Sequence, residues 1–486
     1  MRKPNLLFIF TDEQRYDSML CYGNTFIQTP NLDGLADESI VFERAYVTQP
    51  VCTPARASIM TGLYPHTAKL PTNDISLPDD VPTIAEMVSP DYKRAYIGKW
   101  HLGDELSAQH GFDTWISTED GYVWSYSSKR PRPPVSDYCE FLTHNGFEPN
   151  AEIDGERIFT RGVSARMPEE FTKATFTARE AERFIRENKA DPFVLYINFL
   201  EPHMPYTGPF DNLYDPKSLP QSPAFLKKPA PNSSLYHQLM AEIWENAVFD
   251  GQDLSKRQGW LTMQARYWGL VTLVDRAVGR ILRALEESGA ADNTIVVFTS
   301  DHGDMMGDHS ILAKCVMYEE AVRVPLLVRV PWLGRSQWRI SRPIGQVDIV
   351  PTLLELMGQP IPGHLEGTSR ANVIEGGNTL DDDVFIEWNS SLGIDAALPS
   401  NPNHRERIMA KAQPIHGQPM RTIVTSDSWK LTLSHVDQCE LHDLNEDPHE
   451  LRNLFNAPAQ KARIADLTAK VRQWQKRTSD DCCPAF

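Results

Sequence analysis

Residues 294–303 read Thr294-Ile-Val-Val-Phe-Thr-Ser-Asp-His-Gly303, an apolar run that passes directly into polar residues. Continuous apolar runs of this length are typical of strands buried on both faces, as in parallel sheets covered by helices. The same pattern occurs three more times, with residues 5–10 before Thr11-Asp12-Glu13, residues 95–97 before Gly98-Lys99-Trp100-His101, and residues 193–200 before Glu201-Pro202-His203.

Helical stretches separate these strands, for example residues 171–188 and 261–288. Strand–helix alternation predicts an α/β fold with an open sheet between helices. In such sheets ligands bind just beyond the carboxyl ends of the strands. The four groups of polar residues follow those ends, so we expect them to converge on one site.

The chain beyond residue 375 has a different pattern. Gly376-Gly377-Asn378 is followed by short predicted strands at 384–388, 421–425 and 429–433 and by a helix at 460–477. We therefore predict two domains, a catalytic one at 1–375 and a C-terminal one at 376–486 with a small antiparallel sheet and a terminal helix.

Composition excludes several classes of protein. With 486 residues, 41% of them hydrophobic and a net charge of −17, the chain is an ordinary globular protein without the basic surface of a general nucleic-acid binder. No segment is long and apolar enough to cross a membrane, and the run at 6–10 is too short for a signal peptide. We expect a cytoplasmic protein as given, or a periplasmic or secreted one if a leader has been removed. Seven scattered cysteines without a C-x-x-C pair indicate neither a zinc ribbon nor a disulfide framework.

Residues 52–62 carry a distinctive motif, Cys-Thr-Pro-Ala-Arg-Ala-Ser-Ile-Met-Thr-Gly. Pro54 suits the first turn of a helix and Thr53 its N-cap. Cys52 would then lie at a helix N-terminus, where free N–H groups and the dipole favour an anion. Arg56 could present a fork of donors to a tetrahedral oxyanion.

The predicted strand ends offer candidate metal ligands. Asp12 and Asp301 end two strands, and Glu13 and His302 follow them. Carboxylates placed in this way predict a site for one divalent cation, with calcium the first expectation. Imidazole is less usual around calcium, so His302 leaves magnesium and manganese open.

Other polar residues are candidates for anion binding and proton transfer: Lys99, His101, His203 and Lys314. Lys99 and His101 alternate along a segment that we expect to be extended, so both can face the same side. Asn73 could contact the transferred group. Tyr122 and Trp124 belong to an aromatic cluster beside basic residues 129–132, which could bind a sugar or aromatic group and an extra negative charge. The proline-rich segment 207–258 could be a lid or an oligomer contact.

The motif Cys52-x-Pro54-x-Arg56 resembles the maturation signature of the sulfatase family, and residues 98–103, Gly-Lys-Trp-His-Leu-Gly, resemble a second family signature. Further matches lie at 29–33, 300–303, 324–325 and 441–454. The resemblance implies a type I sulfatase with an alkaline-phosphatase-like core, in which a mixed, mostly parallel sheet lies between helices. It also implies that a maturation enzyme oxidises Cys52 to formylglycine, whose hydrate is the nucleophile. Family members commonly have Asp-Asp where this chain has Asp12-Glu13, so the role of Glu13 is left open.

The resemblance also implies roles for the other candidates. Arg56 and the metal would hold the transferred group, and Lys99 would bind the ester. His101 would take a proton from the remaining hydroxyl of the hydrate and so release sulfate. His203 and Lys314 would stabilise or protonate the leaving oxygen.

Two other functions compete with sulfate-ester hydrolysis. A phosphonate monoester or phosphodiester hydrolase of the same superfamily would use the same metal and aldehyde, although Lys99-Trp100-His101 favours a sulfatase. A non-enzymatic protein that binds sulfated glycans would keep Cys52 as a thiol. The sequence leaves open the substrate (a sugar, aryl or alkyl sulfate) and whether the chain forms a homo-oligomer.

Overall fold

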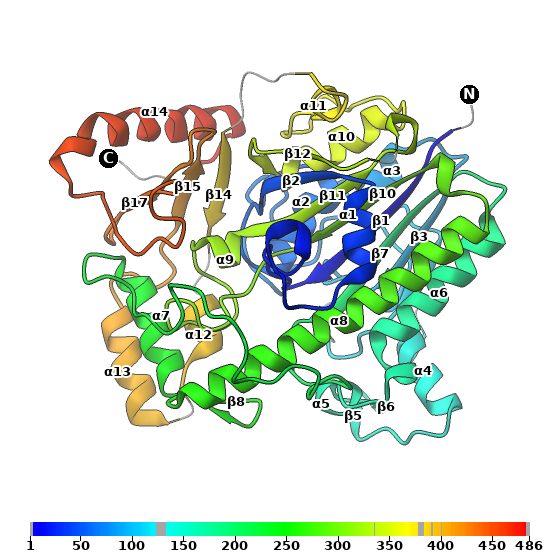
Figure 1. Ribbon diagram of the computed structural model, residues 1–486, viewed down its shortest axis with the longest axis horizontal. Helices are drawn as coiled ribbons and strands as arrows, with labels where there is room; N and C mark the ends of the chain where they lie inside the picture. The colour runs from blue at the N-terminus through cyan, green and yellow to red at the C-terminus, as the bar shows by residue number, and fades with distance from the viewer. Residues whose placement is uncertain are drawn as a thin grey trace.

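A mixed β-sheet occupies the larger, N-terminal part of the computed structural model, which describes residues 3–122, 133–334, 336–377, 383–389, 392–399 and 401–482 (Figure 1). Within these residues the strand order is β12-β2-β11-β10-β1-β7-β3-β4, with β13 paired to β2. Their bounds are β1 Asn5–Asp12, β2 Ile40–Tyr46, β3 Lys93–Gly98, β4 Thr114–Ser117, β7 Phe193–Pro202, β10 Thr294–Ser300, β11 Arg323–Arg329, β12 Trp338–Ile340 and β13 Ile344–Gly345. Pairing is parallel from β10 through to β4, whereas β11 runs antiparallel to both β10 and β2. The mixed, mostly parallel α/β fold is therefore confirmed.

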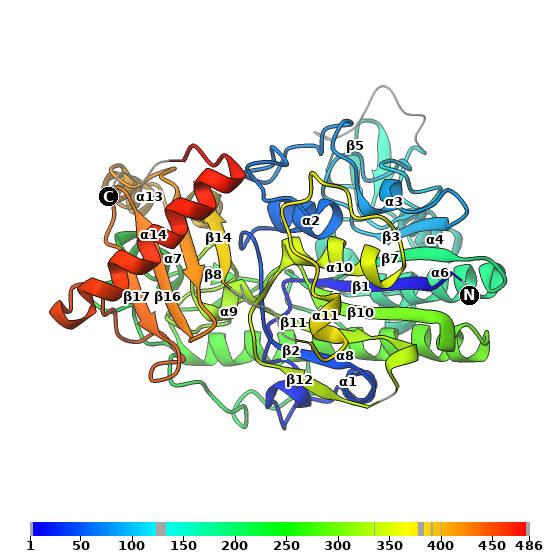
Figure 2. The ribbon, with the colours of Figure 1, turned by 90° about the horizontal axis from the view of Figure 1, so that it is seen from above.

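Both faces of the sheet are covered by helices, as the continuous apolar runs predict. In β1, Leu6, Phe8 and Phe10 pack into one core, and Leu7 and Ile9 pack into another on the opposite face. Figure 2 shows α2 (Cys52–Thr61) and α10 (Ile349–Leu356) above the sheet and α1 (Pro30–Asp37) and α8 (Arg257–Glu287) below it, and α6 (Lys173–Asn188) also packs on the α8 face. Full burial of each Leu, Ile or Phe contributes about 1.5–3 kcal/mol. The strand ends are thus held on a scaffold that is packed from both sides.

Four adjacent parallel strands, β10, β1, β7 and β3, end at the same edge of this sheet. Asp12 is the last residue of β1, and Lys99, His203 and Asp301 directly follow β3, β7 and β10. A register shift between Thr11 and Asp12 marks a β-bulge against β7, a feature that re-aims side chains. The predicted convergence of the polar residues at one edge is confirmed.

A second, antiparallel sheet lies beside the main one, at the left of Figure 1, with strand order β14-β15-β16-β17. Its strands are β14 Val384–Trp388, β15 Met420–Val424, β16 Trp429–Ser434 and β17 Glu440–Asp443, and α14 (Lys461–Thr478) covers one face through Leu467, Val471 and Trp474. The small C-terminal sheet with a terminal helix is confirmed; the division at 375–376 stays a prediction. Lys430 is buried between Glu450 of the same part, at 2.9 Å, and Glu319 of the main part, at 3.1 Å, and the second of these ion pairs joins the two parts.

Two long segments outside the main sheet, one of them the proline-rich segment 207–258, contain short regular elements. Residues 118–166 include α4 (Asp137–His144), the hairpin β5 (Ala151–Ile153)–β6 (Glu156–Ile158) and α5 (Arg161–Ser164). Residues 207–258 include α7 (Leu235–Glu245) and the hairpin β8 (Val248–Phe249)–β9 (Gln252–Asp253). The remaining helices are α3 Ile84–Met87, α9 Glu319–Val322, α11 Ala371–Ile374, α12 Leu392–Ala397 and α13 Pro402–Ala412, with 3₁₀ turns at Leu20–Tyr22, Glu169–Phe171, Ala291–Asn293, Pro331–Leu333, Gln346–Asp348 and Pro458–Gln460. In the described part of the chain, none of the helices combines the length and the apolar character needed to span a bilayer.

Candidate active site

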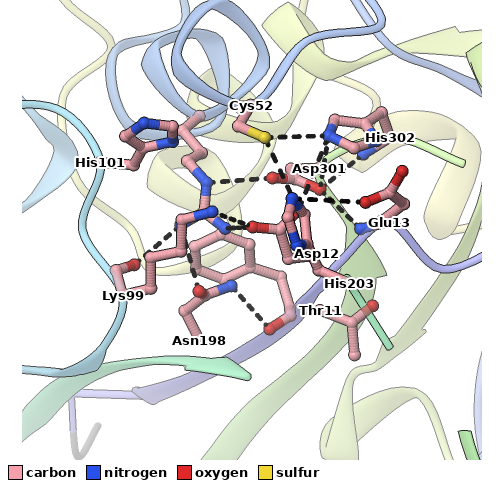
Figure 3. Close-up of polar contacts among 12 residues, drawn as sticks. Thr11, Asp12, Glu13, Cys52, Lys99, His101, Asn198, His203, Asp301 and His302 are labelled. Atoms are coloured by element: carbon pink, nitrogen blue, oxygen red, sulfur yellow. Dashed lines mark hydrogen bonds and ion pairs between the residues drawn. The ribbon is translucent and has the colours of Figure 1, made fainter. Parts of the chain in front are cut away.

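Cys52 and three metal-ligand candidates meet at the carboxyl edge of the main sheet (Figure 3). Ligand atoms of Asp12, Cys52, Asp301 and His302 all lie within 4.8 Å of one another, and all four residues are buried. The Cys52 sulfur is 3.2 Å from His302 Nε2 and 3.7 Å from Asp12 Oδ1. Asp12 also belongs to a second group with Glu13 and His203. The four residues predicted as metal ligands are therefore shared between two adjoining groups.

Helix α2 places Cys52 in its own first turn. The helix begins at Cys52 and its N-cap residue is Val51, so the expectation that Thr53 is the N-cap is wrong. Thr53 instead donates from Oγ1 to the carbonyl of His101 at 2.8 Å. Its free backbone N–H donates to the Asn73 side-chain oxygen at 3.0 Å, so Asn73 caps the helix from another segment. Cys52 thus lies where the helix dipole favours a negative charge.

Arg56 faces the two aspartates from inside the protein. Its guanidinium donates from Nη2 to Asp12 at 2.9 Å and from Nε to Asp301 at 3.0 Å, and all three side chains are fully buried. Nη1 donates to the Lys99 carbonyl at 2.7 Å and to Asn198 Oδ1 at 3.1 Å. The fork that we expected to meet an oxyanion is thus occupied by carboxylates, because Arg56 lies beneath the cluster. In this structure Arg56 acts on the site by fixing Asp12 and Asp301.

Asn198 is a contributor to the site that the sequence analysis missed. From β7 its Oδ1 accepts from Arg56, and its Nδ2 donates to the Phe10 carbonyl at 3.1 Å (Figure 3). The signal was present, because Asn198 is a lone amide inside the apolar run 193–200. A buried polar side chain in a strand needs partners, and here the partners belong to the site.

Lys99 and His101 lie in an irregular segment after β3, and His101 is not extended as predicted. Strand β3 ends at Gly98, which has a φ of 119°, and His101 has a left-handed φ of 57°. The buried carboxylate of Glu105 accepts the N–H of Trp100 at 2.8 Å and that of His101 at 2.6 Å, which holds this segment. Lys99 Nζ contacts Asp12 Oδ2, and His101 joins the same cluster (Figure 3). The irregular backbone, instead of strand alternation, brings the two side chains together.

Glu13 links the cluster to Lys314 and His203. Its Oε2 lies 2.9 Å from Lys314 Nζ and 3.4 Å from His203 Nε2. The Glu13 backbone has a left-handed φ of 72°, and its N–H donates to Asp301 Oδ1 at 3.1 Å. Glu13 Oε1 is buried and has no hydrogen-bond partner within the described residues.

The ionised groups of the site stabilise one another. Burial acts to raise the pKa of Asp12, but Lys99, His203 and Arg56 together hold that pKa well below its usual value. Burial and Asp12 oppose ionisation of Cys52, yet Lys314, Lys99 and His302 lower the pKa of its thiol. Lys314 loses solvation, but the negative groups Cys52, Glu13 and Asp12 raise its pKa well above the usual value, so it is protonated.

The three histidines differ in protonation. Burial and the charges of Lys99 and Arg56 lower the pKa of His101 well below 6.5. Burial and Lys314 do the same for His203, so both rings are neutral near pH 7. Burial acts against the charged form of His302, but Asp301 raises the pKa of this ring to about 9 when no cation is bound.

These donors fit a divalent cation. Asp12, Glu13 and Asp301 supply buried oxygens of the kind that calcium, magnesium and manganese bind, and Glu13 Oε1 still lacks a partner. The Nδ1 of His302 lies 3.0 Å from the Gly303 carbonyl, which selects the tautomer with the lone pair on Nε2. That Nε2 lies 3.6 Å from carboxylate oxygens of both Asp12 and Asp301.

The two aromatic candidates have different outcomes. The ring of Tyr122 packs on His101 with the centroids 4.5 Å apart, so it borders the cluster. Trp124 lies outside the described residues, as do the basic residues 129–132.

Comparisons with known proteins agree with this geometry. The family model described as "Sulfatase" matches residues 4–359. The chain is 30% identical to an arylsulfatase of Clostridium perfringens, over 96% of this chain and 93% of the relative. It is 26% identical to an N-acetylglucosamine-6-O-sulfatase of Bacteroides thetaiotaomicron, over 99% and 88% of the two chains. The fold is similar to a phosphonate monoester hydrolase of Silicibacter pomeroyi, with a TM-score of 0.77, 22% identity and coverage of 99% and 96%.

Proposed function

This chain belongs to the sulfatase family of sulfuric ester hydrolases, and we propose that it cleaves the S–O bond of a sulfate monoester, using formylglycine made from Cys52 and one divalent metal ion. The products are an alcohol and inorganic sulfate. The observation that carries this proposal is the position of Cys52, at the start of α2 and 3.2 Å from His302 Nε2 within a buried cluster of carboxylates and cations.

The non-protein groups would add two capabilities. A divalent cation held by Asp12, Asp301 and His302, with Glu13 beside them, would supply a Lewis acid that polarises the ester and favours an ionised nucleophile. Calcium fits the oxygen-rich donors, while the imidazole leaves magnesium and manganese open. Formylglycine, as its hydrate, would supply the attacking hydroxyl and a second hydroxyl whose ionisation expels sulfate. We propose that a separate maturation enzyme installs this aldehyde.

The charge balance of the site supports an anionic substrate. Arg56, Lys99 and Lys314 pair with Asp12, Asp301 and Glu13 in one cluster, and burial raises the pKa of Glu13 well above its usual value, so the cluster has no excess of negative charge. A bound divalent cation would therefore leave the cluster with a positive excess. That excess favours a sulfate ester, and it favours the transition state more, in which negative charge builds up on the leaving oxygen.

The side chains on the two sides of Cys52 have different roles in the proposed reaction. Lys99, held beside Asp12, binds an oxygen of the sulfate group. His101 is neutral and can accept a proton as a general base. On the side of Glu13, Lys314 is protonated and His203 neutral, so Lys314 supplies the positive charge that stabilises the leaving oxygen. Arg56 keeps Asp12 and Asp301 in place and contacts the substrate only through them.

The relatives indicate the class of substrate. The N-acetylglucosamine-6-O-sulfatase and the arylsulfatase both match nearly the whole of this chain. We propose a sulfated saccharide as the natural substrate, with aryl sulfates as accepted analogues.

The deciding experiment combines mass spectrometry with turnover. Protein from its native host should contain a Cys52 peptide with the mass of formylglycine and should release 4-nitrophenol from 4-nitrophenyl sulfate. Cys52→Ala should abolish turnover, whereas Cys439→Ala, at a buried thiol that bonds Ser434 in the second sheet, should retain it. Full activity in Cys52→Ala would refute the mechanism. An unmodified thiol without turnover would instead support a glycan-binding protein.

Hydrolysis of phosphonate monoesters is the second candidate, because the fold matches that of a phosphonate monoester hydrolase. Lys99 and His101 favour sulfate esters, so we expect a higher kcat/KM for 4-nitrophenyl sulfate than for 4-nitrophenyl phenylphosphonate. The reverse order would assign the chain to the second activity.

A further inference from the structure

A cluster of charged and aromatic side chains borders the active site on the side of His101. We call it the Arg161 cluster, and it consists of Glu119, Tyr122, Arg161 and Lys173. Tyr122 connects it to the site, because its ring packs on His101 and its centroid lies 5.9 Å from Lys99 Nζ. The guanidinium carbon of Arg161 lies 5.2 Å from the same centroid. Arg161 and the ester-binding Lys99 are therefore both within 6 Å of the centre of one ring.

The Arg161 cluster carries an unbalanced positive charge. Glu119 pairs with Arg161 at 2.9 Å and also with Lys173, so one carboxylate serves two cations. Burial acts against ionisation of Glu119, but Arg161 and Lys173 lower its pKa to about 2, so the carboxylate is charged. Among the four residues of the cluster, the two cations therefore outnumber the one carboxylate.

Arg161 is partly buried and is more accessible than Glu119 or Lys173. Its side chain is 32% accessible, compared with 2% for Glu119 and 8% for Lys173. Nε donates to Glu119 and Nη2 to the Tyr122 hydroxyl. Nη1 has no acceptor among the residues that the structure describes. The guanidinium is thus fixed on two nitrogens and can donate from the third.

A small cavity is bordered by both Arg161 and His203, the latter on the side of the site where the alcohol leaves. Its lining also includes Lys173, Thr172 and the carboxyl group of Glu201, whose pKa is raised by burial. His203 also contacts Glu13, which in turn pairs with Lys314. An alcohol leaving past Lys314 and His203 would therefore extend toward Arg161.

We propose that Arg161 forms a subsite for a second anionic substituent, a sulfate or carboxylate, on the leaving alcohol. The inference rests on the proposed sulfatase function and narrows its substrate to a polyanionic saccharide. A guanidinium that is already fixed by Glu119 and Tyr122 can bind such a group with little loss of side-chain freedom. With a substrate whose alcohol part is neutral, Arg161 Nη1 would donate to water.

The test measures binding and does not depend on turnover. In the Cys52→Ala protein, calorimetry compares N-acetyl-D-glucosamine 6-sulfate, which has one anionic group, with D-glucosamine 2-N,6-O-disulfate and 2-O-sulfated glucuronate, which have two. A hydrogen bond to a charged partner predicts about 10- to 100-fold tighter binding of a two-charge sugar. Comparison of the disulfate with the sulfated glucuronate shows whether a sulfate or a carboxylate is the preferred second substituent.

Adding Arg161→Gln should reduce the preference to less than about threefold and leave the Kd of the one-charge sugar unchanged. Arg166→Gln is the matched control, since this arginine of the same segment is exposed and donates to the Gly162 carbonyl, and it should keep the preference. If Arg161→Gln does not fold, Arg161→Lys keeps a positive charge but loses the fork and should still lower the preference.

Equal affinities for one-charge and two-charge sugars, no detectable binding of either two-charge sugar, or an unchanged preference in the Arg161 variants would overturn the proposal. Release of 4-nitrophenol from 4-nitrophenyl sulfate by the matured wild-type protein is measured separately. That activity tests the proposed function, whereas the binding preference tests Arg161.

Discussion

Replacing Asp12 by asparagine should lower both the stability of the metal-free protein and its affinity for a divalent cation. Asp12 Oδ2 accepts from Arg56 at 2.9 Å and from Lys99, and all three side chains are fully buried. Removing one partner from a buried ion pair costs about 3–5 kcal/mol, so the variant should be destabilised even without metal. Asp12 also belongs to both groups of candidate ligands, so its loss should weaken cation binding as well.

Weaker metal binding by the Asp12 variant can be measured as a smaller stabilisation of the folded state by calcium. A ligand at 100 times its Kd stabilises the folded state by about 2.7 kcal/mol. Mutating a residue that merely supports a metal ligand can weaken metal binding by up to about 100-fold. A Kd that is 100-fold weaker reduces the stabilisation by calcium to about 0.4 kcal/mol at the same concentration. Thermal unfolding followed across a calcium series should therefore show a marked rise in Tm for the wild type and almost none for Asp12→Asn.

Asp275→Asn is the matched control for this experiment. Asp275 is a buried carboxylate on α8 that accepts the backbone N–H groups of Asn31 at 3.0 Å and Leu32 at 2.7 Å, at the start of α1. Its replacement should lower stability and leave the calcium response intact. The same apparent Kd in Asp12→Asn as in the wild type, or an equal loss of response in Asp275→Asn, would refute the assignment of Asp12 as a ligand.

Three further predictions concern the end of β3, the base and the second sheet. A Cβ on Gly98 would lie 2.0 Å from the Asn198 carbonyl oxygen at a φ of 119°, so Gly98→Ala should cost more than about 4 kcal/mol in chemical unfolding. Gly34→Ala, in open space on α1, should be neutral or stabilising; equal losses would contradict the steric argument. Burial, Lys99 and Arg56 lower the pKa of His101 well below 6.5, so the ring stays neutral as the pH falls through 6.5. We therefore expect no decrease of kcat/KM with an apparent pKa near 6.5 in its pH profile. A decrease centred at pH 6.5 would count against His101 as the base. Lys430→Met should lower the free energy of unfolding by about 3–5 kcal/mol and increase proteolysis of the C-terminal part, with kcat/KM little changed. Lys470→Met, at a half-exposed ion pair, should lower it by less than about 1 kcal/mol. Similar losses in the two variants would argue against burial as the cause.

The residues at the strand ends could be predicted from sequence because strand direction fixes where a chain leaves a sheet. Asp12 ends β1 and Asp301 follows β10, and these strands are parallel neighbours. Any polar residue at such an end must lie at the same edge. The helix that begins at Cys52 was likewise visible in the spacing of Cys52 and Pro54, although its N-cap was placed two residues too late.

The partners of each side chain were not visible in the sequence, because they depend on turns and on side-chain directions. The left-handed conformations of Glu13 and His101 aim these residues in ways that no periodicity records. Asn198 supports the site from within a predicted apolar strand, and Glu105 supports it from a position to which the sequence analysis assigned no role.

The sequence by itself determined the α/β sheet, the edge at which chemistry gathers and the residue types available there, since apolar periodicity and strand ends are local properties of the chain. Only the tertiary structure decided that Arg56 binds carboxylates from below, that Glu13 joins Lys314 and His203, and that Arg161 bonds Glu119 and Tyr122. Those contacts join segments tens to hundreds of residues apart. Their geometry is set by the packing of both faces of the sheet and by the few ways in which buried charges can be paired.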